Sequence, residues 1–158
     1  MLLLRSLFFT FLLPGTVTVL IPYWLVSSRF RVRDIHWFQY AGLPLILIGA
    51  AGLLGCVWQF FSEGHGTLAP IDAPKELVVR GLYKYVRNPM YVSVVTILVG
   101  EAIVFGSSVI IIEAVIFIAL AYLFVVFYEE PSLRQRFGES YEKYSYRVGR
   151  WVPRSKAS

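Results

Sequence analysis

The sequence predicts an all-α integral membrane protein with about four transmembrane helices and a C-terminal amphipathic helix at the membrane surface. Of its 158 residues, 57% are hydrophobic and 16% aromatic, and the mean hydropathy is +0.63, which is too apolar for a soluble domain of this length. The apolar residues form four blocks, and the basic residues gather at the block edges, where lipid head groups lie. We therefore expect residues 1–158 to form one membrane domain in contact with the bilayer.

The first two crossings are predicted at residues 7–26 and 37–61. An α-helix rises about 1.5 Å per residue, so about 20 apolar residues cross a hydrocarbon layer about 30 Å thick. The second block contains a stripe of small residues, Gly49, Gly52 and Gly55. Such a stripe lets a neighbouring helix approach closely, so we interpret it as a packing surface.

The last two crossings are predicted at residues 89–105 and 109–128. Only the turn Gly106-Ser107-Ser108 separates them, which forces the two helices to be antiparallel neighbours. As a consequence, the residues that precede the third crossing and those that follow the fourth lie on the same membrane face.

Residues 62–88 form a long polar connection, which we interpret as a cytoplasmic binding loop. Two short runs, Leu77-Val78-Val79 and Tyr83-Lys84-Tyr85, flank Arg80 and Gly81. This pattern predicts a small extended hairpin at the membrane surface.

The last predicted helix covers residues 131–148 and is amphipathic, because its apolar residues recur at spacings of three and four. These apolar positions are Leu133, Phe137, Tyr141, Tyr144 and Val148. Basic residues occupy its other faces, as expected of a helix that lies on the membrane surface.

The distribution of Lys and Arg predicts the orientation, because these residues are in excess in cytoplasmic loops. With four crossings, one side carries Lys75, Arg80, Lys84, Arg87, Arg134, Arg136, Lys143, Arg147, Arg150, Arg154 and Lys156. The other side carries Arg29, Arg31 and Arg33. We therefore expect both termini and the 62–88 loop on the cytoplasmic side, although the three arginines opposite leave a tilted or re-entrant first segment open.

The third crossing begins with features suited to an anion. Asn88 is a good N-cap and Pro89 suits the first helical position. The free N–H groups of that first turn and the adjacent Arg87 favour a negative group there. The alternative is that these polar residues simply mark the boundary between lipid and water.

Glu129 and Glu130 follow the fourth crossing, where carboxylates oppose the helix dipole and need a cation. An ion pair with Arg87, Arg134 or Arg136 would supply one. The functional alternative is a ligand whose cationic or hydroxyl groups meet the acids while its anionic end lies at the start of the third crossing. A ligand with an amino group, a carboxylate, a ribose and a sulfonium fits that polarity.

The remaining polar residues do not define a ligand or metal site. Glu101 and Glu113 lie five residues before Gly106 and five after Ser108, so we expect them to face one another far from the proposed site, in a structural or substrate-orienting role. His36, His65 and Cys56 do not form a metal-site pattern, so no metal is expected. No nucleic-acid signature and no P-loop or dinucleotide glycine motif is present, so no nucleic-acid partner is expected.

Three blocks of this chain, in order, resemble the isoprenylcysteine carboxyl methyltransferase and phospholipid methyltransferase family, and most closely its short bacterial branch. The blocks are Gly64-x-Gly66-Thr67-Leu68-Ala69-Pro70; Leu77-Val78-x-x-Gly81-Leu82-Tyr83-Lys84-Tyr85-Val86-Arg87-Asn88-Pro89-Met90-Tyr91; and Glu129-Glu130-x-x-Leu133-x-x-x-Phe137-Gly138-x-x-Tyr141-x-x-Tyr144, closing on Arg150-Trp151-x-Pro153. The resemblance covers roughly residues 62–154.

The resemblance implies an enzyme of the bacterial inner membrane that transfers a methyl group from S-adenosylmethionine to an amphiphilic or lipid acceptor. The cofactor pocket would lie on the cytoplasmic side. Positions implied to bind the cofactor are Gly64, Gly66, Lys75, Glu76, Leu77, Val78, Tyr83, Arg87, Asn88, Pro89, Met90, Tyr91, Glu129 and Glu130. Glu130, Arg87 and Tyr83 are the candidate catalytic residues; Glu130, Tyr83 and His65 are alternatives for a base.

This sequence departs from the family pattern at two positions. Asn88 stands where many members have histidine. Val125 stands where the eukaryotic prenylcysteine enzymes have an arginine thought to hold the substrate carboxylate, so a prenylcysteine carboxylate is not expected as the acceptor. The competing hypotheses are a membrane reductase with a soluble nicotinamide cofactor and a non-enzymatic four-helix membrane scaffold. The sequence predicts neither the acceptor nor the number of subunits.

Overall fold

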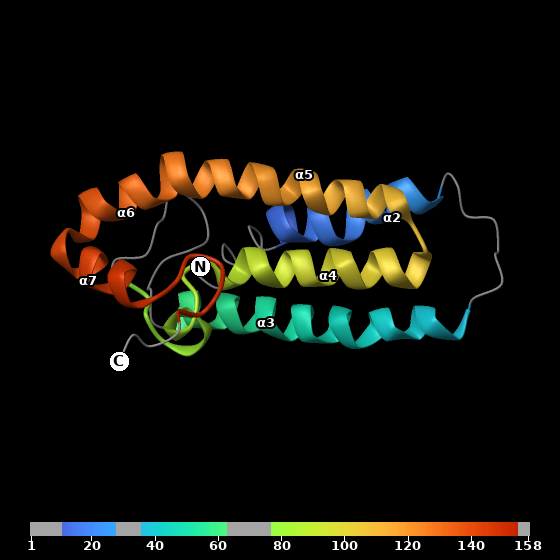
Figure 1. The fold of residues 1–158 in the computed structure, drawn as a ribbon, viewed down its shortest axis with the longest axis horizontal. Helices are drawn as coiled ribbons and strands as arrows, with labels where there is room; N and C mark the ends of the chain where they lie inside the picture. Colours follow the sequence, from blue (N-terminus) through green and yellow to red (C-terminus); the bar gives the residue numbers. More distant parts are fainter. Residues whose placement is uncertain (1–10, 28–35, 63–76, 155–158) are drawn as a thin grey trace.

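The computed structural model describes residues 11–27, 36–62 and 77–154. In these ranges the long elements are helices that run along one common axis (Figure 1). The predicted basic loop and several predicted cofactor positions lie outside the described residues. These are Arg29, Arg31, Arg33, Gly64, His65, Gly66, Lys75 and Glu76.

The first described segment is a π-helix, η1 (Phe11–Leu20), which continues as α2 (Ile21–Ser27). Pro14 lies inside the π-helix, and the Thr18 hydroxyl donates a hydrogen bond to its carbonyl oxygen (2.8 Å). Proline cannot donate within a helix, so irregular turns and side-chain hydrogen bonds accompany it.

The second segment begins with a 3₁₀ turn, η2 (Trp37–Ala41), and continues as α3 (Gly42–Ser62). Helix α3 lies side by side with α4 (Pro89–Phe105) (Figure 1). The predicted small-residue stripe lies partly at this contact. A Cβ atom added at Gly49 would lie 2.8 Å from the Ser93 carbonyl oxygen, whereas one at Gly55 would meet nothing within 4 Å.

Helix α4 turns directly into the antiparallel α5 (Ser108–Phe124), as the sequence predicts. Gly106 ends α4 in the left-handed conformation (φ 57°), and its N–H reaches the Ala102 and Ile103 carbonyl oxygens. Glycine adopts this conformation without a Cβ penalty, so the chain reverses in two residues. A buried apolar core joins these helices: Leu53, Val94, Ile97, Leu98, Ala102, Ile110 and Ala114.

The C-terminal region differs from the prediction of one surface helix over residues 131–148. Helix α5 continues through a π-turn, η5 (Val125–Glu129), into α6 (Glu130–Phe137) as one unbroken helical stretch. Pro131 lacks the N–H that would bond to the carbonyl of the preceding turn, and the wider π-turn comes immediately before it. The break comes instead at Gly138 (φ 50°), which separates α6 from α7 (Glu139–Arg147).

The predicted hairpin around Arg80 is wrong. Residues Gly81–Lys84 form a 3₁₀ turn, η4, so residues 77–79 and 83–85 do not pair with each other. Val86 instead forms an isolated parallel bridge with Gly149 near the C-terminus. The long-range partner was not visible in the local pattern from which the hairpin was predicted.

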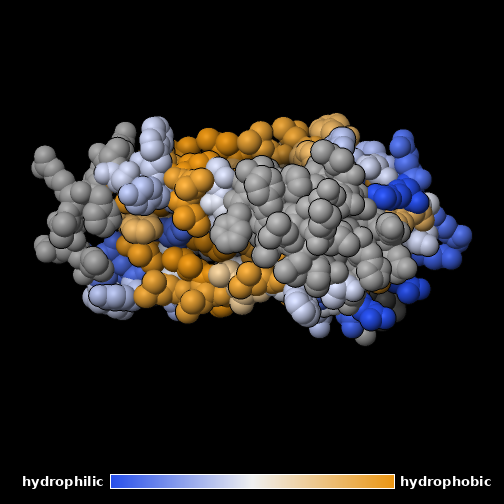
Figure 2. Space-filling model, turned by 180° about the vertical axis from the view of Figure 1, so that it is seen from behind, coloured by the Kyte–Doolittle hydropathy of each residue, from blue (hydrophilic) through white to orange (hydrophobic). Residues whose placement is uncertain are grey.

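Two described helices are long and apolar enough to cross a membrane, Trp37–Gln59 and Ser108–Phe137. Pro89–Phe105 is apolar but has only 17 residues. On the face that Figure 2 shows, hydrophobic side chains form much of the coloured surface between the two ends, and strongly hydrophilic ones gather at the end that carries α6 and α7. The helical character of the described residues is thus confirmed, while four membrane crossings remain a prediction.

Candidate active site

The polar residues predicted to act together meet at one end of the helix bundle. The turn η4, the start of α4, the η5–α6 junction, α7 and the C-terminal segment all converge there (Figure 1). Arg87 and the two glutamates therefore lie on the same face, as the short turn between α4 and α5 requires.

Glu130 is the centre of this cluster and is only 5% exposed. Arg150 holds it with two hydrogen bonds, from Nε to Oε1 (2.7 Å) and from Nη2 to Oε2 (2.9 Å). Arg87 adds a third contact, with Nη1 3.0 Å from Oε1. A buried carboxylate needs such compensation, because an unpaired charge is costly away from water. Glu130 therefore has an internal cation on each side.

Arg87 also meets a tyrosine, because its Nη1 donates to the Tyr141 hydroxyl on α7 (3.1 Å). Its Nε is buried and has no hydrogen-bond partner within residues 11–27, 36–62 and 77–154. A buried donor without an acceptor is rare in a folded protein. The Nε–H of Arg87 is thus an unsatisfied buried donor among the described residues.

Glu129 differs from its neighbour. Its Oε2 accepts a hydrogen bond from the Tyr91 hydroxyl (3.1 Å), and it makes no ion pair in the part of the chain that the structure describes. The Tyr91 ring has Phe117 at 6.2 Å and Trp151 at 6.2 Å between centroids. A carboxylate beside aromatic rings is a suitable environment for a positively charged ligand group.

Helix α4 begins at Pro89, as predicted, but the Asn88 side chain does not cap it. Its Nδ2 donates instead to the Arg150 carbonyl oxygen (3.1 Å). Asn88 is buried and therefore ties the helix start to the C-terminal segment. The first-turn N–H groups of α4 donate no hydrogen bond to this side chain.

Tyr83 lies in a second buried cluster with Cys56 and Val78, against which Met90 packs. Burial raises the pKa of the Tyr83 hydroxyl well above its usual range, so this group stays protonated near neutral pH. The Tyr83 carbonyl oxygen accepts a hydrogen bond from the Tyr144 hydroxyl of α7 (2.8 Å). Leu77, beside Val78, is half-buried. This cluster adjoins the acids through Met90 and Tyr91 at the start of α4.

Comparison with known proteins identifies the family. A family model described as phospholipid methyltransferase matches residues 37–140, which is more than half of the chain. The chain belongs to the phospholipid methyltransferase family.

Two curated proteins are similar to this chain. Both are rice proteins, from Oryza sativa subsp. indica and subsp. japonica, each described as a probable protein-S-isoprenylcysteine O-methyltransferase. Each is 28% identical over 123 residues, which cover 75% of this chain and 63% of the relative. The chain thus matches somewhat less than two thirds of the length of these relatives.

Arg150 and Trp151 also lie at the candidate site, although they were not predicted as site candidates from the sequence. Both lie in the closing Arg150-Trp151-x-Pro153 block. An arginine directly after an amphipathic helix resembles an ordinary lipid-facing charge. Only the fold shows that Arg150 turns back toward Glu130, about 20 residues earlier in the sequence.

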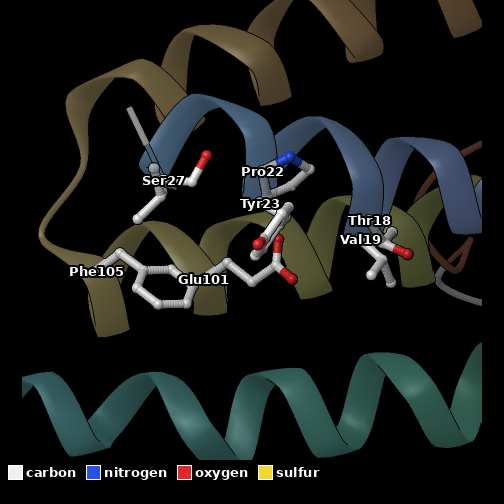
Figure 3. Close-up of a pocket in the computed structure, with 8 residues that line it drawn as sticks. Thr18, Val19, Pro22, Tyr23, Ser27, Glu101 and Phe105 are labelled. Atoms are coloured by element: carbon white, nitrogen blue, oxygen red, sulfur yellow. The ribbon is translucent and has the colours of Figure 1, made fainter. Parts of the chain in front are cut away.

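Glu101 and Glu113 lie toward the other end of α4 and α5, as predicted. Glu101 reaches from α4 into a pocket of about 420 Å³ beneath the first helical segment, beside Tyr23 (Figure 3). Oε2 of Glu101 and both carboxyl oxygens of Glu113 are buried without a hydrogen-bond partner among the described residues. These acids are separate from the Glu130 cluster.

Proposed function

We propose that this protein is an integral-membrane methyltransferase that uses S-adenosylmethionine and acts on a lipid-soluble or amphiphilic acceptor. The chain belongs to the phospholipid methyltransferase family. The observation that carries the proposal is the contrast between its two adjacent acids, Glu129 and Glu130. Glu130 is compensated by Arg87 and Arg150, whereas Glu129 makes no ion pair among the described residues and accepts a hydrogen bond from Tyr91, whose ring lies near Trp151.

The side chains fit the charges of S-adenosylmethionine. Glu129 and the ring of Tyr91 suit its positively charged sulfonium. The orphaned Nε of Arg87 suits an acceptor oxygen such as a carboxylate oxygen. When bound, this cofactor supplies a methyl group whose carbon–sulfur bond breaks, with the electron pair remaining on sulfur, as an acceptor lone pair forms the new bond to carbon.

In this proposal the chain's own residues orient the Glu129 carboxylate and compensate the charges of the site. Tyr91 fixes the Glu129 carboxylate through its hydroxyl, and orientation of reacting groups accounts for much of the rate enhancement of many enzymes. An acceptor that carries a proton also needs a base. Tyr83 is unsuited to this role because it stays protonated, and Glu130 because two arginines hold it. We therefore assign any proton acceptance among the described residues to Glu129.

The acceptor binds from the membrane in this proposal, since the site lies at the end of the apolar helices α4 and α5 that carries α6 and α7 (Figure 1). The relatives' description suggests a prenylated cysteine carboxylate, and the family description suggests a phospholipid. Val125, at the position of the eukaryotic arginine, is 1% exposed and begins the π-turn, so this side chain offers a carboxylate no cation. This observation favours an acceptor other than a prenylcysteine carboxylate.

Titration calorimetry on the purified full chain in detergent tests the proposal. We expect micromolar binding of S-adenosylhomocysteine and S-adenosylmethionine, and no binding of NADPH. Glu129→Gln should weaken S-adenosylmethionine binding by about tenfold, since it removes the charge that faces the sulfonium. Glu142→Gln, an exposed acid on α7, is the matched control and should bind as wild type.

The competing functions give different results in the same titration. NADPH binding without S-adenosylhomocysteine binding would indicate a reductase, and binding of neither would indicate a scaffold. A labelled-methyl assay with a phospholipid extract and, separately, a prenylcysteine analogue then distinguishes the acceptor classes.

A further inference from the structure

The segment Val148–Trp151 lies across the start of α4 and is part of the site. The Arg87 N–H donates to the Gly149 carbonyl oxygen (2.8 Å), and Val86 forms a parallel bridge with Gly149. These backbone contacts, with the hydrogen bond from Asn88 to the Arg150 carbonyl, fix the position of Arg150 independently of its side chain.

The Arg150 side chain uses this position to reach Glu130 with a two-point fork, at 2.7 and 2.9 Å. Planar guanidinium and carboxylate groups match well in this arrangement. Glu130 and Arg87 alone would form a neutral pair, so Arg150 contributes one additional positive charge. The four charged groups Arg87, Arg150, Glu129 and Glu130 then sum to zero.

Without Arg150, these groups would sum to one negative charge. Charges within a few ångströms interact strongly at the effective dielectric of a partly buried site, although the 31% exposure of the Arg150 side chain reduces this effect. A cationic ligand would be favoured over a neutral ligand of the same shape. S-adenosylmethionine and its demethylated product form such a pair, because the sulfonium carries the charge that the thioether lacks.

We propose that Arg150 is a positioning residue that determines specificity. Beside Glu130 it adds the positive charge that brings Arg87, Arg150, Glu129 and Glu130 to a sum of zero, and so limits the preference for a cationic donor over the neutral product. This inference rests on the proposed function, because it concerns the same ligands.

The measured quantity is the ratio of two dissociation constants, that of S-adenosylhomocysteine divided by that of S-adenosylmethionine, from calorimetry on the full chain in detergent. Arg150→Gln should raise this ratio about fivefold, and Glu130→Gln should lower it by a similar factor. The double variant removes one charge of each sign, so its ratio should lie within about twofold of wild type. Arg136→Gln removes an exposed positive charge on α6 and is the control, with no change expected in the ratio.

A purely structural role gives a different result. If Arg150→Gln weakens both ligands by the same factor, Arg150 only holds the chain or contacts a group that both ligands share, and the proposal is overturned. If Arg150→Gln does not fold, Arg150→Lys provides the test. Lysine keeps the positive charge without the two-point hydrogen bonding, so the ratio of dissociation constants must stay at the wild-type value. Any shift of this ratio beyond about twofold contradicts the proposal. A wild-type protein that binds neither ligand would instead refute the proposed function.

Discussion

Arg150 and Glu130 form a two-point ion pair between the C-terminal segment and the helix that carries both site acids. Arg87 contacts the same carboxylate at 3.0 Å. Three elements distant in sequence are thereby joined at one buried group. This arrangement makes Glu130 important for stability as well as for the charge of the site.

Glu130→Gln should therefore destabilise the protein. Removing one member of a buried charge cluster leaves the others uncompensated, which typically costs about 3 kcal/mol or more. We expect a lower thermal melting temperature in detergent. Glu142→Gln also breaks an ion pair with an arginine, Arg134, but both side chains are more than half exposed, so its effect should be about 0.5 kcal/mol or less. Equal shifts of the melting temperature in the two variants would show that the buried Glu130 cluster stabilises the protein no more than an exposed ion pair does.

Gly49→Ala should destabilise the packing of α3 on α4. The new methyl group would lie 2.7 Å from an Ile97 side-chain carbon and 2.8 Å from the Ser93 carbonyl oxygen, so the helices must move apart. Overpacking of this kind costs about 1–3 kcal/mol. Gly55→Ala, on the same helix, meets nothing within 4 Å and should be neutral or slightly stabilising, because alanine is the better helix former. Melting curves of both variants provide the comparison, and an unchanged Gly49→Ala would contradict the close approach.

Alkaline pH should destabilise the wild-type protein through Tyr144. Burial raises the pKa of its hydroxyl above the usual value, and this hydroxyl donates to the Tyr83 carbonyl oxygen. A group whose pKa is raised by folding stabilises the protein below its unfolded pKa of about 10, and this stability is lost as pH rises toward the folded value. Melting temperatures from pH 8 to 11 should fall above pH 10, and Tyr144→Phe should reduce that fall. Tyr146→Phe, which removes an exposed hydroxyl, should leave the profile unchanged.

Glu113→Met should raise the melting temperature. Both carboxyl oxygens of Glu113 are buried without hydrogen-bond partners among the residues described, and replacing such a group by an apolar one of similar size removes a desolvation penalty of about 1–3 kcal/mol. Ile112→Met, an adjacent exposed position on α5, is the control. A lower melting temperature for Glu113→Met would show that the carboxyl group has a partner that stabilises it.

The amino-acid sequence by itself determined those structural elements that depend only on residues close together in the chain. The apolar blocks, Pro89 at the start of α4 and Gly106 at its end all follow from residue types a few positions apart. The placement of Arg87 and the two glutamates at the same end of the helices was also predictable, because the short turn makes α4 and α5 antiparallel neighbours.

The tertiary structure decided which charges pair and which do not. Arg150 was not distinguishable in sequence from the other basic residues at the membrane edge, since its partner is set by the break at Gly138 and the bridge between Val86 and Gly149. The same long-range contacts turned Asn88 away from the helix N-terminus and replaced the predicted hairpin by a 3₁₀ turn. Local sequence patterns encode backbone preferences, whereas the compensation of a buried charge depends on groups that only the completed fold brings within 3 Å.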